Sequence, residues 1–320
     1  MNITDLWNFL LVHPLISLLV GAYDLLPDFG FAVVLVTLLI RLALYPLYVT
    51  QIRSQRAMQE LAPAIKELQQ KHGKDKARIQ QEQMKLYQER GINPLGGCLP
   101  LLLQMPILFA MYAAFQQAPL LDGEQLRQAV WPFIQLPAGV GPAEHLDMTA
   151  HWLPWITTCE QNGGTFHGLA CPDHLFGITG IVPIFAGALQ LVASLQAMPA
   201  NQPKSEDPNV RMTQTMAYYF PLITVYFAST FPSGLAVYWV TTTVFQIVQQ
   251  YFVSGWGQLV KYLPFLRAIP TPSDRVMAQH ERAAIREVEA DMAGGGAEAD
   301  VAPGEWDANA RRRRRRRRGR

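Results

Sequence analysis

Apolar residues gather in five stretches of this 320-residue chain, and each stretch is close to 20 residues long. An α-helix rises about 1.5 Å per residue, so about 20 apolar residues cross the ~30 Å hydrocarbon core of a bilayer. The pattern therefore predicts an all-α, polytopic membrane protein with five transmembrane helices, which form a core over residues 30–255. The predicted spans are 30–49, 95–115, 175–195, 213–231 and 235–253.

Residues 1–29 are predicted to form a helix that lies in the outer membrane interface. The apolar run 6–20 is short for a span, and His13 and Pro14 interrupt it. No basic residue precedes this run, which argues against a cleavable signal peptide. A sixth span is the alternative interpretation.

Basic residues are distributed unevenly between the loops, and this distribution orients the spans. The segment 51–92 contains nine Lys and Arg residues, whereas 116–174 contains one. Because cytoplasmic loops are enriched in Lys and Arg, the first segment is predicted to lie inside and the second outside. We therefore expect a multi-pass protein of the plasma membrane, with its N-terminus outside and its C-terminus in the cytoplasm.

The basic segment after the first span has the pattern of two helices that fold back on each other. Apolar residues recur with the 3,4,3 spacing of a helix–helix seam from Met58 to Leu68, and Gly73 then interrupts the pattern. A cytoplasmic helical hairpin is therefore predicted over residues 53–91. The alternative is a solvated, charged loop.

The long loop 116–174 is predicted to lie outside the cell. It is rich in proline and glycine, and its tryptophans suit a membrane–water interface. Cys159 and Cys171 lie in this loop. Because the outside of most cells is oxidising, these two cysteines could form a disulfide.

The chain becomes polar after the last span, and residues 256–320 are predicted to form a disordered cytoplasmic tail. Nine of the last ten residues are arginines, which form a basic arm. Clustered positive charge attracts the phosphates of RNA and anionic lipid headgroups equally well, so either could bind the arm. The arm consists of Arg311, Arg312, Arg313, Arg314, Arg315, Arg316, Arg317, Arg318 and Arg320.

Arg41 is the only charged residue in the predicted spans, and it lies near the middle of the first one. A guanidinium stays protonated there, and its insertion into the hydrocarbon costs about 2.5–3.5 kcal/mol on insertion scales. The spans contain no Asp or Glu that could pair with it. The sequence therefore predicts a cation that faces water or a visiting polar segment. The alternative is a structural arginine that snorkels or binds backbone carbonyls.

Polar side chains at helical spacing on several spans indicate a hydrated groove around Arg41. Thr37 and Tyr45 share its face of the first span. Each polar stripe alone could instead hold helices together, so the combination of stripes carries this prediction. The other predicted groove residues are Gln190 and Ser194 in the third span, Tyr226 in the fourth, and Trp239, Thr242 and Gln246 in the fifth.

The sequence lacks the motifs of common catalytic sites. It contains no phosphate-binding P-loop, no HExxH pair and no GxSxG nucleophile elbow. The seven histidines do not show the spacing of metal ligands. We therefore expect no enzyme activity, no cofactor and no metal.

Three motifs, in the same order, resemble those of the YidC/Oxa-type membrane protein insertases. They are LVTLLIRLALYPL at 35–47, NPLGGCLPLLLQMP at 93–106, and Phe220-Pro221 followed by FPSGLAVYW at 231–239. The resemblance covers about residues 5–255 and is to bacterial members without a large domain outside the membrane. The long outside loop with its cysteine pair and the poly-arginine end depart from the family pattern.

The resemblance implies a groove that is open to the cytoplasm and to lipid. Arg41 matches the arginine of that groove, Trp239 is similar to a groove residue, and Gln190 is a looser match. The resemblance also implies that the hairpin receives substrates or targeting components and that the basic tail binds ribosomes. The expected partners are nascent membrane proteins, the ribosome, the Sec translocon, signal recognition components and the lipid bilayer.

Together these features predict a membrane protein insertase that helps nascent hydrophobic segments enter the bilayer without nucleotide hydrolysis. A membrane protein assembly chaperone or ribosome-binding scaffold would share every one of these features, so that alternative stays open. A small-anion transporter is a further alternative, but the sequence shows no internal repeat of the kind common in transporters.

Overall fold

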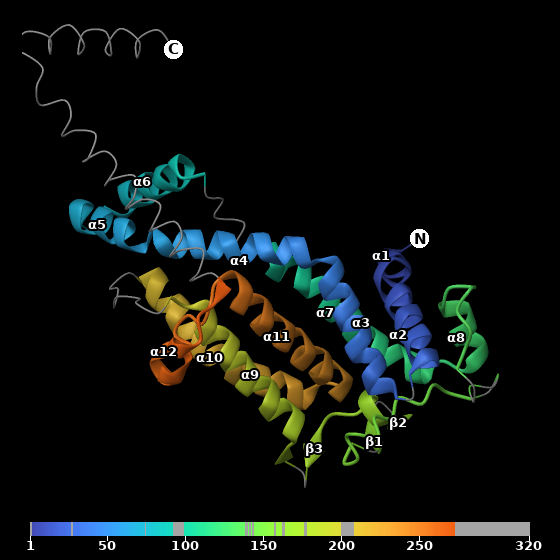
Figure 1. Cartoon of the computed structure of the whole chain (residues 1–320). Helices are drawn as coiled ribbons and strands as arrows, with labels where there is room; N and C mark the ends of the chain where they lie inside the picture. Colours follow the sequence, from blue (N-terminus) through green and yellow to red (C-terminus); the bar gives the residue numbers. More distant parts are fainter. Residues whose placement is uncertain are drawn as a thin grey trace, which may run out of the picture. The chain divides into compact units, whose positions relative to one another are not determined.

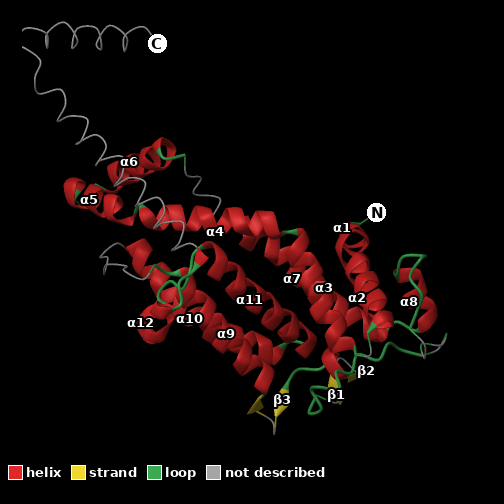
Figure 2. Cartoon of the chain, in the orientation of Figure 1, coloured by secondary structure: helices red, strands yellow, loops and turns green. Residues whose placement is uncertain are grey.

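The computed structural model describes residues 2–26, 28–73, 75–91, 99–137, 140, 142, 144–156, 158–161, 164–175, 178–199 and 208–272. This part of the chain is mainly helical, as predicted (Figures 1 and 2). The prediction of an all-α fold missed two short antiparallel hairpins, one in the loop 116–174 and one at the start of the predicted third span. Strand β1 (Thr158–Gln161) pairs with β2 (Gly164–His167), and β3 (His174–Leu175) pairs with β4 (Ile178–Thr179).

The N-terminal segment is one continuous helix. It comprises α1 (Ile3–Trp7), a π-helical turn (Asn8–Val12) and α2 (His13–Leu25). The expected interruption at Pro14 does not occur, because a proline is tolerated in the first turn of α2 and the π-helical turn comes directly before it. Ile3–Leu25 is long and apolar enough to cross a membrane. The short length expected for this helix was therefore wrong, and its placement in the outer interface stays a prediction.

The first predicted span is bent rather than straight. Helix α3 (Phe29–Ala43) and helix α4 (Tyr45–Glu60) meet at Leu44 at an angle of 65°. Pro46 explains the bend, because it cannot donate a hydrogen bond to the carbonyl of Leu42 and its ring crowds that carbonyl. Arg41 therefore lies in the last turn of α3 and not in the middle of a straight helix, which corrects the sequence-based placement.

Two helices follow α4 where the hairpin was predicted. Helix α5 (Ala62–His72) ends at Gly73, and α6 (Lys76–Glu89) packs back against α5. Gly73 has a φ of +58°, a conformation that glycine adopts readily. Leu61 and Ile65, which belong to the predicted seam, are buried.

Four longer helices occupy the other predicted spans. They are α7 (Leu99–Gln117), α9 (Ile181–Ala197), α10 (Pro208–Thr230) and α11 (Ser233–Val253). Residues 92–98, where the second span was predicted to start, lie outside the described residues. The third span starts later than predicted, because the chain before Gly180 forms the β3–β4 hairpin. Of the described helices, only Ile3–Leu25 and the bent α3–α4 pair meet the length and hydropathy criteria for a span. The count of five spans stays a prediction.

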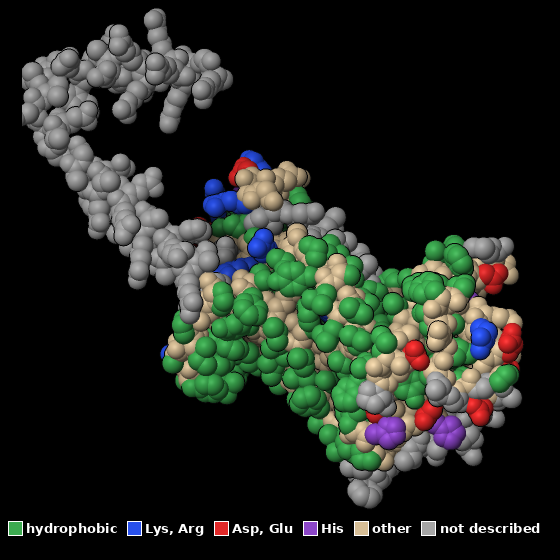
Figure 3. Space-filling view, turned by 45° about the vertical axis from the view of Figure 1, so that its right-hand side comes forward, with side chains coloured by type: hydrophobic (Ala, Val, Ile, Leu, Met, Phe, Trp, Pro, Cys, Tyr) green, Lys and Arg blue, Asp and Glu red, His purple; other side chains and the backbone are tan. Residues whose placement is uncertain are grey.

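The described helices pack around a large apolar core, and a small second cluster lies at the end of α9. Helix α11 packs against α3 and α9, α10 packs against α9, and α2 packs against α3 (Figure 1). The largest buried side chains of the core include Ile16, Phe29 and Phe115. Other hydrophobic side chains cover much of the surface seen in Figure 3. Such a surface is expected where helices face lipid instead of water.

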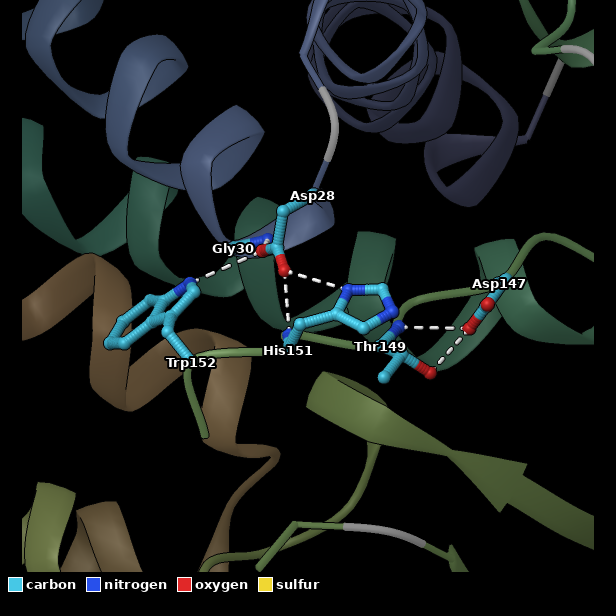
Figure 4. Close-up of polar contacts among 6 residues, drawn as sticks. All are labelled: Asp28, Gly30, Asp147, Thr149, His151 and Trp152. Carbon is cyan, nitrogen blue, oxygen red and sulfur yellow. Dashed lines mark hydrogen bonds and ion pairs between the residues drawn. The ribbon is translucent and has the colours of Figure 1, made fainter. Parts of the chain in front are cut away.

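Two buried aspartates tie the loop 116–174 to α3 and α9. Asp28 caps the start of α3, where its Oδ1 accepts from the Gly30 amide at 2.7 Å. The same carboxylate accepts from the backbone amide of His151 at 2.6 Å and from the Trp152 indole at 3.2 Å (Figure 4). Residues about 120 positions apart are thereby held together.

Asp173 connects the loop to the start of α9 in the same way. One of its carboxylate oxygens accepts from the Val182 amide at 2.8 Å, and the other accepts from the Trp155 indole at 2.9 Å. Cys159 and Cys171 form a disulfide in the same loop. Helix α8 (Gly123–Ala129) and the 3₁₀ turns Ala118–Leu120 and Gly168–Ala170 complete this region.

The compact unit continues beyond the end predicted for the core. Helix α12 (Leu259–Tyr262) and the 3₁₀ turn Pro264–Ala268 follow α11, and the unit reaches Thr271. The predicted tail boundary at residue 256 was therefore too early. The poly-arginine arm lies outside the described residues.

Candidate functional site

Arg41 is buried where four helices meet. Only 5% of its surface is exposed. Its position in the last turn of α3 is favourable for a cation, because the free carbonyl groups at a helix C-terminus carry partial negative charge. Its guanidinium lies over the ring of Tyr48 in α4, with 4.3 Å between Cζ and the ring centroid. This cation–π contact offsets part of the cost of removing the charge from water.

Gln104 in α7 connects the other polar groups around Arg41. Its Oε1 accepts from the Tyr48 hydroxyl at 3.0 Å and from Arg41 Nη2 at 3.5 Å. Its Nε2 donates to the hydroxyl of Tyr238 in α11. We call these four side chains, Arg41, Tyr48, Gln104 and Tyr238, the Arg41 cluster. The cluster joins α3, α4, α7 and α11 near the bend at Leu44.

Arg41 forms no ion pair with any residue that the structure describes. Its polar contacts are a neutral amide at the outer limit of hydrogen-bond distance and a tyrosine ring. Neutral partners of this kind hold a guanidinium more weakly than a carboxylate does, because charge-assisted hydrogen bonds are about twice as strong. A carboxylate that reached the cluster would therefore compete well for Arg41.

Most of the predicted groove residues lie outside the Arg41 cluster. Thr37 is buried, but its hydroxyl donates to the carbonyl of Val33 in the preceding turn. Thr242 is buried one turn after Tyr238 on α11. Within the described chain, no hydrogen bond joins the cluster to the remaining predicted residues. Gln190, Ser194, Trp239 and Gln246 are half-buried, and Tyr45 is 41% exposed.

Tyr226 is 66% exposed and lies on the outer surface of α10. It stacks edge-on against its neighbour Phe227. Helical spacing identifies residues that share a face, but it does not tell which face turns inward. Tyr226 therefore does not line the interior as expected.

The interior beside the Arg41 cluster contains further polar groups. Buried side-chain oxygens of Gln196, Gln249 and Gln250 have no hydrogen-bond partner among the described residues. These residues come from α9 and α11, whose packing surface is consequently polar in part. A shallow recess lies next to this surface, between α4, α9 and α11. It is lined by Ile52, Gln55, Arg56, Ala197, Gln250 and Ser254.

The comparisons with known proteins identify the family of this chain. A family model described as 60Kd inner membrane protein matches residues 21–258. The membrane protein insertase YidC of Oceanobacillus iheyensis is 31% identical over 79% of this chain and 85% of its own length. The chain belongs to this family. The family resemblance inferred from the three sequence motifs is thereby confirmed.

The share of the relative's own length that the match covers differs between members of the YidC family. Membrane protein insertase YidC 2 of Bacillus anthracis is 32% identical over 79% of this chain and 82% of its own length. YidC of Wolinella succinogenes is 34% identical over 75% of this chain, but the match covers 36% of that longer protein. A crystal structure of an active YidC insertase with its first transmembrane domain resolved has a TM-score of 0.47 and 25% identity. That match covers 79% of this chain and 47% of the solved chain.

Sequence reasoning missed the central role of Gln104. Gln104 is the only amide side chain in the predicted second span, and an isolated amide in an apolar helix signals a buried polar partner. The sequence also did not single out Tyr238, which stands next to Trp239 in the third motif. The pairing of both with Arg41 depends on how α7 and α11 rotate against α3, which helical periodicity alone does not determine.

Proposed function

We propose that this chain is a membrane protein insertase that offers Arg41 to the polar or acidic part of an incoming segment. The observation that carries the proposal is the burial of Arg41 with one amide and one tyrosine ring as its side-chain contacts among the described residues. Membership of the YidC family supports the same activity. A carboxylate on the incoming segment would replace Gln104 Oε1 as the acceptor of Arg41 Nη2.

The weak contacts of Arg41 fit a transient role. The burial of the site strengthens its attraction to a visiting carboxylate relative to the same pair in water. For release, Arg41 re-forms its contacts with Gln104 and Tyr48 as the carboxylate leaves. Once the polar part has passed, the apolar part enters lipid, and burial of apolar surface at about 25 cal/mol per Å² supplies the driving force. No nucleotide is consumed in this scheme, which requires no enzyme activity.

The membrane arrangement that supports this function has five spans. They are the bent α3–α4 pair, α7, α9, α10 and α11, with the hairpin α5–α6 in the cytoplasm and the disulfide loop outside. The N-terminal helix packs against α3 and α7 and also contacts α8 of the outside loop. These contacts favour a position in the outer leaflet for that helix. We propose a plasma-membrane location with the N-terminus outside.

Partners would approach from the cytoplasm. We propose that α5 and α6 receive the nascent chain, signal recognition components or the Sec translocon. The basic arm would hold the ribosome near the site, because a protein that neutralises RNA phosphates gains affinity from the release of counterions.

Deletion of residues 311–320 is predicted to weaken ribosome binding and to remove most of its salt dependence. Nine positive charges are lost, and the affinity contributed by phosphate contacts falls steeply with salt. Co-sedimentation of the protein in detergent micelles with ribosomes, over a series of salt concentrations, measures both effects. An unchanged affinity and slope would assign the arm to another ligand, with anionic lipid as the first alternative.

Reconstitution into liposomes tests the insertase function itself. The full chain, without other translocation proteins, is mixed with ribosomes that translate a single-span substrate with an acidic translocated end. We expect protease-protected, alkali-resistant substrate well above the level in empty liposomes. Insertion at the level of empty liposomes would instead favour an assembly chaperone or scaffold.

A further inference from the structure

The chain after α11 folds back onto the end of α9. We call residues 254–269 the return segment. The amide of Gln258 donates to the carbonyls of Leu195 at 3.0 Å and Met198 at 2.9 Å, so two free carbonyls at the end of α9 are satisfied. The side chain of Gln196 donates to the carbonyl of Gly255 at 3.1 Å. The return segment is therefore fixed to the end of α9 by hydrogen bonds.

A glycine allows this close approach. Gly257 has a φ of +53°, and a Cβ added to it would stand 2.0 Å from the carbonyl oxygen of Gln196. The inner side of the segment is apolar, where Leu259 and Leu266 pack with Leu195 and Met198 in a small buried cluster. The return segment is thus a packed part of the fold.

The outer side of the return segment is also apolar, although it is exposed. Its exposed fractions reach 62% at Phe265 and 56% at Tyr262. The set of large exposed apolar side chains consists of Tyr262, Leu263, Phe265 and Ile269. Two exposed basic residues, Lys261 and Arg267, flank its centre. Water would be a poor environment for this face, since four large apolar side chains within eight residues form a patch and not scattered exposure.

We propose that the return segment is a lipid-binding surface that binds anionic phospholipid at the membrane boundary. In this arrangement, Tyr262, Leu263, Phe265 and Ile269 enter the zone between headgroups and acyl chains, and Lys261 and Arg267 contact the headgroup phosphates. The inference rests on the proposed function in one respect, namely that α9 and α11 span the bilayer. The return segment is bonded to the ends of both helices and is therefore held at the depth where the hydrocarbon ends.

The lipid-facing surface of α10 continues into the return segment. The hydroxyl groups of Tyr218 in α10 and Tyr262 in α12 lie 3.1 Å apart. Tyr218 is itself exposed, and the next residues along α10 include the exposed Tyr219 and Leu222. Exposed apolar residues on a predicted span that contact the segment match a bilayer edge. Tyrosine and basic residues are the types that gather at that depth.

Charge favours anionic lipid over a neutral surface. Lys261 and Arg267 are the only charged residues in the return segment. A surface that combines apolar and aromatic groups with basic residues binds bilayers that contain anionic lipid more tightly than neutral ones. A protein partner would also cover the patch, and the experiment below treats it as the competing occupant.

A spin label at position 265 tests the depth of the segment. Phe265→Cys is made in a Cys98→Ser chain, labelled with a nitroxide and reconstituted in vesicles of phosphatidylcholine and phosphatidylglycerol. Collision with oxygen, which partitions into lipid, is compared with collision with a water-soluble nickel chelate. Ile184→Cys on the exposed face of α9 and Gln81→Cys on α6 provide the lipid and water references. We expect the label at 265 to resemble the label at 184. A label that resembles position 81 would overturn the proposal and leave the patch to a protein partner.

The charges are tested separately by the lipids that remain bound. Lys261→Gln/Arg267→Gln is compared with Arg78→Gln/Lys85→Gln, which removes two exposed charges from α6. Native mass spectrometry counts phosphatidylglycerol and phosphatidylcholine bound after extraction from mixed vesicles. We expect the first pair to lose several-fold of its phosphatidylglycerol enrichment and the second pair to keep it. Equal enrichment in both pairs would overturn the headgroup contact. Neither experiment uses a substrate. A negative result here would therefore refute lipid binding by the return segment without bearing on the insertase function.

Discussion

Arg41→Met is expected to lower the insertion of a substrate with an acidic translocated end about tenfold. The change removes the charge that the substrate carboxylate would meet, and a loss of about 1.4 kcal/mol corresponds to a factor of ten. The same change is expected to leave the folded protein as stable as before or more stable. Replacement of a buried ionic group by an apolar side chain of similar volume is often neutral or stabilising by about 1–4 kcal/mol. Activity and stability are therefore expected to move in different directions.

Insertion rates in proteoliposomes, for a matched pair of substrates, measure this effect. One substrate carries an acidic translocated end, and the other carries the corresponding amides. Arg41→Lys retains the charge and should keep most of the activity on the acidic substrate. If folded Arg41→Met inserts several acidic substrates at the normal rate, the charge-attraction step is wrong. The polar interior would then act by its hydration alone.

Asp28→Ala is expected to lower the free energy of unfolding by about 3 kcal/mol. Loss of a helix N-cap costs about 0.5–2 kcal/mol, and each buried donor left without a partner adds about 1–3 kcal/mol. Asp28 is 4% exposed and accepts from Gly30, His151 and Trp152, so its removal affects both α3 and the outside loop (Figure 4). Water that enters the truncated site recovers part of the cost, which keeps the expected loss below the sum of these contributions.

Denaturant titration in detergent micelles, followed by tryptophan fluorescence, measures the loss. Asp147→Ala is the matched control, because Asp147 is exposed and, among the described residues, its carboxylate bonds only to Thr149 in its own turn (Figure 4). The control is expected to change stability by less than about 1 kcal/mol. Equal losses in the two variants would show that Asp28 does not join the loop to α3 with the assigned strength.

The chemistry of the candidate site could be predicted from the sequence better than its geometry. The order of residues alone shows that Arg41 stands among apolar residues and that the predicted spans contain no acidic residue. The bend was not, because hydropathy treats 30–49 as one apolar run and takes no account of how Pro46 redirects it. As a result, the sequence placed Arg41 in mid-span. The structure places it beside the bend between α3 and α4, where α7 and α11 also meet.

The boundaries of the spans show the same limit. The apolar run from Leu175 looked like the start of a helix, but Asp173 accepts from the Val182 amide and fixes the start of α9 at Ile181. Likewise, the chain after Val253 was predicted to be a disordered tail because it is polar overall, but its first part packs on α9 through Leu259 and Leu266. Caps and return contacts are tertiary features, so local hydropathy does not reveal them.

Site-specific photocrosslinking tests most directly whether an incoming segment reaches the Arg41 cluster. A diazirine amino acid is placed at Gln104 or at Phe109, which is 55% exposed on the same helix. Ribosome-bound nascent chains of increasing length then present an acidic translocated end to the reconstituted protein. We expect a crosslink from position 104 to the acidic end over a narrow range of chain lengths, with little crosslinking of that end from 109. Absence of the crosslink at 104, or equal crosslinking of the acidic end at both positions, would show that the segment does not reach the Arg41 cluster.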